Sequence, residues 1–261
     1  MESGNAQTAG RVCVFCGGSP VTSEHAWPQW IAKYVAEDRA TLYRVVERPG
    51  EEPDVETLGG DRYPFTTTVR CVCEACNTGW MHELESTAEP QLAPLIEGRT
   101  TNRNGNPWRW REWRQSVAAT WATKTAIMLE HVQPEHRAMP DQFARLFRYY
   151  MRPPNQQQVW IAHYTGTQPH GFYHGPLALF DRRKPGEPEV ATGYAATIAV
   201  GHLVFRIFGH TVRDGPVSVP EGDVASSLSQ IQPVVPSAEW PPSLSVDDDG
   251  LHTITLSMQI P

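Results

Sequence analysis

The chain has 261 residues, of which 40% are apolar and 20% charged, and this composition is typical of a globular protein in water. Its length suggests one or two domains. No run approaches the roughly 18 consecutive apolar residues of a membrane-spanning helix, so we expect no transmembrane segment. Residues 1–10 lack the basic start and apolar run of a signal peptide, which predicts a flexible tail, a cytoplasmic location and no membrane partner.

The formal net charge of −7 is unfavourable for binding nucleic acid, because phosphate groups attract a basic surface. The charge is unevenly distributed, however, since acidic residues crowd the segment 47–61 and arginines gather between residues 99 and 114. Arg109, Arg111 and Arg114 alternate with tryptophans, and we predict that these arginines contact substrate phosphates. The spacing of the tryptophans themselves is more typical of a buried core.

Four of the five cysteines form two C-x-x-C pairs, Cys13 with Cys16 and Cys73 with Cys76. Two such pairs can supply four thiolates to one tetrahedral Zn²⁺, so we predict a structural zinc at these positions. An odd number of cysteines in a long chain argues against a secreted disulfide framework, and a thioredoxin-like redox pair would need only one C-x-x-C. Cys71 is expected to be a bystander, or a substitute ligand for Cys73 if the local register differs.

The predicted elements of the first part of the chain begin with a strand or zinc knuckle over residues 11–16. Residues 28–36 have helical spacing of apolar side chains. Residues 38–68 form an insertion of another character, which we predict to be a hairpin of strands 41–46 and 64–70 with an acidic loop between them.

Helices are predicted for the middle of the chain. The segment 75–89 has helical spacing, and Pro90 and Pro94 are expected to end it. Apolar residues recur at helical spacing over 112–132, which predicts an amphipathic helix, and a shorter helix is predicted over 141–150.

Beyond residue 153 the sequence is rich in β-branched and aromatic residues separated by turn-forming residues. The predicted strands of this part are 159–164, 177–180, 193–200, 202–208 and a final strand, 250–258.

The order of motifs around the cysteines resembles the HNH endonuclease superfamily. Glu24 and His25 follow the first C-x-x-C pair, Pro28 lies three residues after the histidine, and Asn77 directly follows the second pair. The resemblance covers roughly residues 11–90, and it implies a zinc-bracketed ββα-metal, treble-clef-like module. We therefore expect an α+β protein with an HNH module over 11–98, a helical linker over 99–152 and a β-rich domain over 153–261.

The resemblance implies metal-dependent hydrolysis of phosphodiester bonds in nucleic acid, with DNA as the expected substrate. Glu24 and the side-chain oxygen of Asn77 would hold a divalent ion such as Mg²⁺, and His25 would act as the general base. An imidazole suits this role because its ordinary pKa, about 6.5, leaves it neutral at cellular pH. His82 is predicted as a substrate contact only, because a position five residues beyond Asn77 lies off the same face of an α-helix.

A second hypothesis assigns the same residues to structure alone. Glu24 and His25 then form a polar pair ahead of a helix, and Asn77 caps the zinc knuckle. Under this alternative the module is a non-catalytic zinc-binding element that contacts nucleic acid or protein. The acidic net charge favours the alternative, whereas the complete set of Glu24, His25 and Asn77 favours the enzyme. In both hypotheses the four paired cysteines bind the structural zinc.

Overall fold

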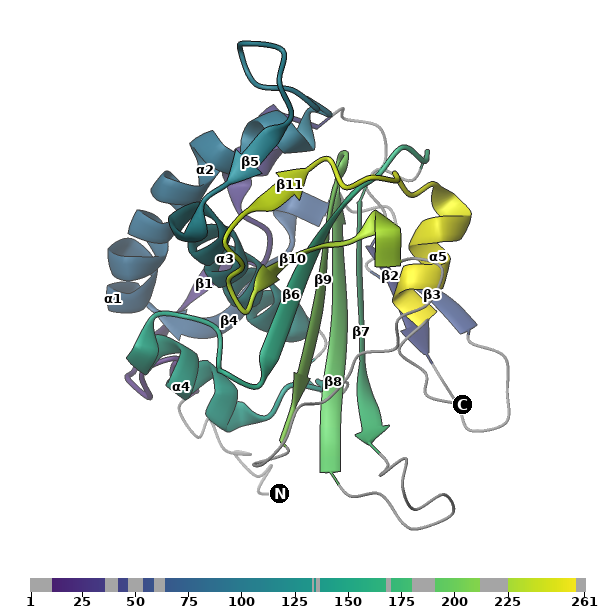
Figure 1. Ribbon diagram of the computed structural model, residues 1–261. Coiled ribbons are helices and arrows are strands. Elements are labelled where there is room, and N and C mark those ends of the chain that lie inside the picture. The colour runs from purple at the N-terminus through teal and green to yellow at the C-terminus, as the bar shows by residue number, and fades with distance from the viewer. Residues whose placement is uncertain are drawn as a thin grey trace, which may run out of the picture.

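The computed structural model describes residues 11–35, 42–46, 54–58, 64–132, 134, 137–167, 170–179, 191–211 and 225–256. Its centre is a five-stranded sheet in which every pair of neighbouring strands is antiparallel (Figure 1). The strand order is β10 (Ser229–Gln232), β6 (Gln157–His163), β9 (Leu203–His210), β8 (Ala191–Val200) and β7 (His170–Leu179). The strands expected between residues 159 and 208 are therefore present.

The sheet is covered on both faces, as Figure 1 shows. Successive side chains of a strand point to opposite faces, so Ile161 belongs to the main core and Ala162 to a smaller one. Helix α3 (Glu112–Glu130) packs on the main-core face. Helix α5 (Asp248–Leu256) contributes Leu251 to the smaller cluster. The two helices and the sheet thus form three layers.

Helix α3 is buried on all sides over residues 118–130, so the prediction of an amphipathic helix with a solvent face is wrong. The sheet covers one side of the helix and α2 (His82–Ile96) covers another. Several of its buried polar side chains, among them Gln115, Thr123 and Lys124, have internal hydrogen-bond partners instead of water. Thr123, for example, accepts a hydrogen bond from Gln157, which in turn accepts one from the Tyr194 hydroxyl at 2.6 Å.

The N-terminal part is a two-stranded ladder followed by helical segments. Strand β1 (Val21–His25) pairs antiparallel with β4 (Thr68–Cys73). The chain then continues through α1 (Glu74–Cys76), a π-helical turn η3 (Asn77–Met81) and α2. A strand–strand–helix order around the cysteines is therefore present.

Helix α2 continues to Ile96 with both Pro90 and Pro94 inside it, so the expected end near residue 89 is wrong. Pro90 is exposed and Pro94 is only half-buried. Pro90 has no N–H to donate to the carbonyl of Ser86, but Ser86 is itself an exposed residue. Buried side chains on the opposite side, including Leu92, hold the helix against α3. Packing therefore outweighs the loss of two backbone hydrogen bonds.

The pairing within the insertion also differs from the prediction. Strand β2 (Leu42–Val46) pairs with β3 (Asp54–Leu58), whereas the segment that was expected to be its partner, 64–70, forms η2 (Pro64–Thr66) and the start of β4. Strand β2 also lies against β7 of the large sheet. The predicted acidic loop spanned residues 47–63, of which the described part, 54–58, forms strand β3, and residues 47–53 and 59–63 lie outside the described residues.

Of the C-terminal segment 250–258, predicted as a strand, residues 250–256 belong to helix α5 instead, and residues 257–258 lie outside the described residues. Asp248 and Asp249 occupy its first turn, where negative charge is favourable, and the carboxylate of Asp247 accepts a hydrogen bond from the N–H of Gly250 at 2.8 Å. Leu251 and Ile254 are three residues apart and are both buried, which is helical spacing.

The remaining elements connect these layers. Their bounds are Gln29–Lys33 (η1), Trp108–Trp110 (β5), Asp141–Tyr150 (α4), Ala225–Ser227 (η5) and Ala238–Trp240 (β11), and β5 pairs antiparallel with β11. No helix in the described part of the chain is both long and apolar enough to cross a membrane.

One core joins the parts of the chain. Its buried residues come from each of the three segments 11–98, 99–152 and 153–261. Hydrogen bonds cross the same boundaries, since His202 N–H donates to the carbonyl of Ile96 at 3.0 Å and the Trp240 indole donates to the carbonyl of Arg99 at 2.9 Å. The N-terminal part with the four cysteines is therefore packed against the five-stranded sheet and α3.

Candidate metal centre and active site

The first C-x-x-C pair lies on a tight turn. Gly17 N–H donates to the carbonyl of Cys13 at 2.8 Å, and Cys13 N–H donates to the carbonyl of Gly18 at 2.7 Å. Gly17 has a φ of +74°, a conformation that glycine adopts without strain. A Cβ on Gly18 would lie 3.2 Å from the sulfur of Cys16, so a side chain there would crowd the thiol. The two glycines let both sulfurs face the same point.

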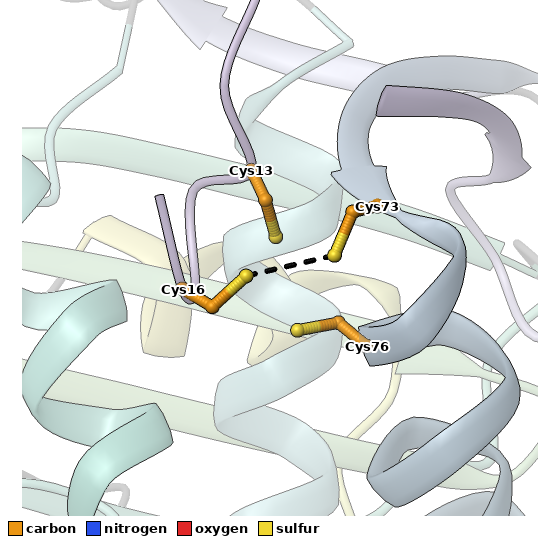
Figure 2. Close-up of side chains that lie close together, drawn as sticks. All are labelled: Cys13, Cys16, Cys73 and Cys76. Atoms are coloured by element: carbon orange, nitrogen blue, oxygen red, sulfur yellow. Dashed lines mark hydrogen bonds between the residues drawn. The ribbon is translucent and has the colours of Figure 1, made fainter. Parts of the chain in front are cut away.

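The β1–β4 ladder brings the second pair to the same place. Val21 lies opposite Cys73, so the turn that precedes β1 adjoins the end of β4. The sulfurs of Cys13, Cys16, Cys73 and Cys76 all lie within 4.8 Å of one another, and Figure 2 shows them pointing inward. The Cys16 and Cys73 sulfurs are 3.5 Å apart, and all the cysteines are free thiols.

This donor set fits a tetrahedral zinc. Zinc–sulfur bonds of about 2.3 Å in a tetrahedron place the sulfurs about 3.8 Å apart, close to the spacing observed. Burial raises the pKa of Cys76 to about 12, against the opposing effect of the Trp80 indole. Burial also raises the pKa of Cys13, but the backbone N–H groups of Cys73, Cys16 and Phe15 outweigh it and lower that pKa to about 7. A bound cation would hold all four sulfurs as thiolates.

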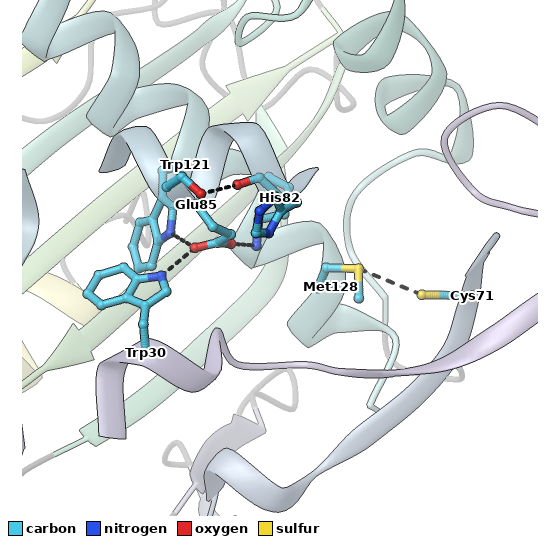
Figure 3. Close-up of polar contacts among 8 residues, drawn as sticks. Trp30, Cys71, His82, Glu85, Trp121 and Met128 are labelled. Atoms are coloured by element: carbon cyan, nitrogen blue, oxygen red, sulfur yellow. Dashed lines mark hydrogen bonds and ion pairs between the residues drawn. The ribbon is translucent and has the colours of Figure 1, made fainter. Parts of the chain in front are cut away.

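Cys71 lies outside this group. Its side chain is buried, and its sulfur lies 3.9 Å from that of Met128 (Figure 3). Burial raises its pKa to about 12. Cys73, and not Cys71, therefore belongs to the group of cysteines that could hold a metal ion, as the spacing of the C-x-x-C pairs predicts.

The predicted catalytic residues lie on two elements that adjoin the cysteine group. Glu24 and His25 are half-buried near the end of β1, and Asn77 is half-buried directly after α1. Glu24 Oε1 accepts a hydrogen bond from the Thr22 hydroxyl at 2.8 Å, and His25 Nε2 lies 3.1 Å from the side-chain nitrogen of Gln29. No hydrogen bond in the described part of the chain joins Asn77 to Glu24 or His25.

The π-helical turn changes the position of His82 relative to Asn77. The N–H of His82 donates to the carbonyl of Asn77, a hydrogen bond that spans five residues. Gly79 within this turn has non-helical φ and ψ, so the helix is kinked between Asn77 and His82, and the offset predicted from an ideal α-helix does not apply. His82 is exposed, so it remains accessible from solvent.

The predicted arginine surface is only partly exposed for binding. Arg109 lies 3.4 Å from Glu239 in an exposed ion pair, and Arg111 is exposed at the start of α3. The guanidinium of Arg114 lies over the rings of Trp108 and Trp113, at 5.6 and 5.5 Å from their centroids. The neighbouring Trp110 is buried in the core, as the spacing of the tryptophans predicts, whereas Trp108 is half-buried and Trp113 is 54% exposed, so the prediction is wrong for Trp113.

One buried polar cluster was not predicted. The indole N–H groups of Trp30 and Trp121 donate to Glu85 Oε2 at 2.6 and 2.8 Å, and the ammonium of Lys124 pairs with Glu85 Oε1 (Figure 3). The Lys124 side chain is only 4% exposed. This cluster, Trp30–Glu85–Trp121–Lys124, fastens η1 and α2 to α3. Its sequence signal was the pair of tryptophans, because a buried indole needs a hydrogen-bond acceptor.

No family model, curated protein or solved structure matches the chain. Within the described residues, the four cysteines are the only group of three or more histidine, cysteine or acidic side chains close enough to hold a metal ion. The geometry therefore defines a four-cysteine centre of the zinc-binding type on a strand–strand–helix unit.

Proposed function

We propose that the protein is a metal-dependent endonuclease of the HNH type that hydrolyses phosphodiester bonds of nucleic acid, with DNA as the substrate. The observation that carries the proposal is the four-cysteine centre at one end of the β1–β4 ladder. This centre holds together the strand that carries Glu24 and His25 and the helical segment that begins before Asn77. The resemblance in sequence adds the roles of these three residues.

The carboxylate of Glu24 has the chemistry of a ligand for a hard cation. Its Oε1 is oriented by the Thr22 hydroxyl, and its Oε2 has no hydrogen bond within the described residues. The side chain of Asn77 likewise makes no hydrogen bond within the described residues, which leaves its oxygen available. A Mg²⁺ ion held by these oxygens would polarise the scissile phosphate and stabilise the leaving oxygen.

His25 would remove the proton from the attacking water. Its Nε2 accepts a hydrogen bond when the side-chain amide of Gln29 donates, which fixes the ring orientation. Displacement of Gln29 by the substrate or the water would then free this nitrogen as the base. His82, which follows Asn77 across the π-helical turn, would contact the substrate from the helix side.

The contacts of Glu24 and His25 also favour the second candidate, a non-catalytic zinc module. Both side chains already have local partners, Thr22 and Gln29, which suits residues that only stabilise the end of β1. The net charge of −7 favours a protein partner over nucleic acid under this alternative.

A plasmid-nicking assay tests the proposal. Zinc-loaded protein is expected to nick plasmid DNA only with added Mg²⁺ or Mn²⁺, and His25→Ala and Glu24→Gln are each expected to reduce the rate by at least about a hundredfold. His252→Ala is the matched control, because His252 is exposed on α5, on the far face of the sheet from α3. Nicking by His25→Ala at the wild-type rate would refute the mechanism, and inactive wild-type protein with every divalent ion would favour the alternative.

A further inference from the structure

Helix α4 has one buried side, which lies against the zinc module. Phe143, Ala144 and Phe147 are buried. The ring of Phe147 lies 6.2 Å from that of Phe15 and 5.9 Å from that of Trp80, measured between centroids. Phe15 belongs to the first cysteine turn, so α4 is fixed directly beside the four-cysteine centre.

The other side of α4 presents aromatic rings to solvent. Tyr149 is 80% exposed and Tyr150 is 56% exposed. Their ring centroids are 4.9 Å apart and their planes meet at 89°, so the two rings do not stack face to face on each other. Large exposed aromatic side chains next to each other are typical of binding surfaces.

The same side is basic although the chain as a whole is acidic. Residues 142–152 contain Arg145, Arg148 and Arg152 and no acidic residue. Arg148 lies over the ring of Trp80, with its guanidinium carbon 5.4 Å from the centroid, and Arg152 lies 5.9 Å from the centroid of Tyr150. Arg145 and Arg148 are three residues apart on the helix, which is helical spacing, and Arg152 follows the C-terminal end of the helix beyond the left-handed Met151.

A cleft of about 240 Å³ continues this surface at the N-terminal half of α4, and Arg137 and Arg145 line it. The carboxylates around the cleft already have donors. Asp141 pairs with Arg137 at 2.6 Å, and Glu130 accepts hydrogen bonds from the N–H of Met139 at 3.2 and 3.0 Å. The buried Nε of Arg137 has no hydrogen-bond partner in the described part of the chain. The unused hydrogen-bonding capacity of the cleft therefore lies with its donors, which suits an anionic group.

We propose that the exposed side of α4, together with the adjoining cleft, binds single-stranded nucleic acid. Phosphates would contact Arg145, Arg152 and the cleft, and unpaired bases would stack on Tyr149 and Tyr150. A duplex has the phosphates, but its paired bases are already stacked and cannot stack on the tyrosines. An acidic protein partner would match the charge of the arginines but would bring no bases to stack on the tyrosines. The proposal rests on the proposed function, which supplies nucleic acid as the ligand, and it narrows that ligand to strands with unpaired bases.

Fluorescence anisotropy with a labelled single strand and a duplex of equal length tests this surface. The measurements use zinc-loaded protein without other divalent ions, so that no cleavage occurs. The double variant Tyr149→Ala/Tyr150→Ala is expected to weaken single-strand binding by at least about tenfold and to change duplex binding much less. The matched control is Leu244→Ala, since this apolar side chain is also 54% exposed but lies outside the surface and away from the arginines, and the affinity of this variant should stay at the wild-type value.

The salt dependence provides a second measurement that needs no aromatic substitution. Arg145→Gln combined with Arg152→Gln is expected to reduce the slope of log affinity against log salt by about 1.4, roughly 0.7 for each lost phosphate contact on a single strand. Wild-type affinity in the double tyrosine variant would overturn the proposal. Equal loss of single-strand and duplex binding in that variant would also overturn it. The same holds if the substitutions abolish self-association in sedimentation and leave nucleic-acid binding unchanged.

These outcomes separate the two proposals. If the tyrosine variant loses single-strand binding while the wild type never nicks nucleic acid, the α4 surface stands and the nuclease mechanism fails. If nicking depends on His25 and Mg²⁺ while the tyrosine variant binds single strands normally, the mechanism stands and the α4 surface fails.

Discussion

The buried cluster around Glu85 leads to a quantitative prediction. In Glu85→Gln the ammonium of Lys124, whose side chain is 4% exposed, loses its counter-charge. Removal of one member of a buried ion pair costs about 3–5 kcal/mol, because the remaining charge stays out of water. In Lys124→Met the carboxylate keeps the two indole donors and is 18% exposed, so we expect a smaller loss of about 1–3 kcal/mol.

The double variant Glu85→Gln/Lys124→Met separates charge from shape. It leaves no buried charge, and the glutamine oxygen still accepts from an indole. We therefore expect it to be more stable than Glu85→Gln alone, with a coupling of about 2 kcal/mol between the two sites.

Urea unfolding of the zinc-saturated proteins measures these free energies, and unchanged slopes against denaturant would show that the midpoints report stability. The control is Glu89→Gln, which removes a more exposed ion pair one turn further along α2: Lys33 of η1 is 64% exposed and Glu89 of α2 is 27% exposed. That pair should contribute less than about 1 kcal/mol. The reasoning fails if the effects of Glu85→Gln and Lys124→Met simply add in the double variant.

Three further predictions concern the metal, acid stability and the contact between α2 and the sheet. Cys73→Ser should lower bound zinc well below one ion per chain in a metal analysis, whereas Cys71→Ser should leave one, and equal zinc loss in both would contradict the assignment of ligands. Burial, then a neighbouring arginine, lowers the pKa of His131 from 6.5 to about 4, so the unfolded state binds more protons below about pH 6.5 and acid removes stability. Between about pH 7 and about pH 5 the wild type should lose about 2 kcal/mol more unfolding free energy than His131→Gln, and equal losses would show that the folded pKa is not depressed. Gly201→Ala should destabilise the protein more than Gly105→Ala in thermal melts, because both glycines have positive φ but only a Cβ on Gly201 would lie 2.3 Å from a backbone oxygen at the end of α2.

The metal centre could be predicted because its signal is local. Each C-x-x-C pair fixes two sulfurs on one turn, and the glycines after Cys16 mark that turn in the sequence. The choice of Cys73 over Cys71 follows from the register of β4, where only one of two residues on the same side of the strand reaches the turn. The relation of Asn77 to His82 could not be predicted, because a π-turn has no distinctive pattern in one sequence.

Long-range pairing was predicted less well for a physical reason. The apolar pattern of residues 64–70 indicates a strand but does not select its partner, and β1, with its polar residues Thr22, Ser23 and Glu24, gives little strand signal of its own. Helix α2 likewise continues past two prolines because of packing that only the folded chain provides. The final segment has apolar residues whose spacing fits a strand or a helix, and Asp247 at its start decides for the helix.

The hydrogen bond from His202 to Ile96 and the shared core have a consequence for how the protein loses its structure. Zinc binding free energy is folding free energy wherever the site and the fold form together. The cysteine turn packs on α4, and α2 packs on α3. Removal of zinc by a chelator should therefore destabilise the large sheet as well as the β1–β4 ladder and the cysteine turn. A bound metal would then stabilise the core that all three segments share. A fragment that ends at residue 98 would lack α3 and would expose the apolar side chains that pack against it.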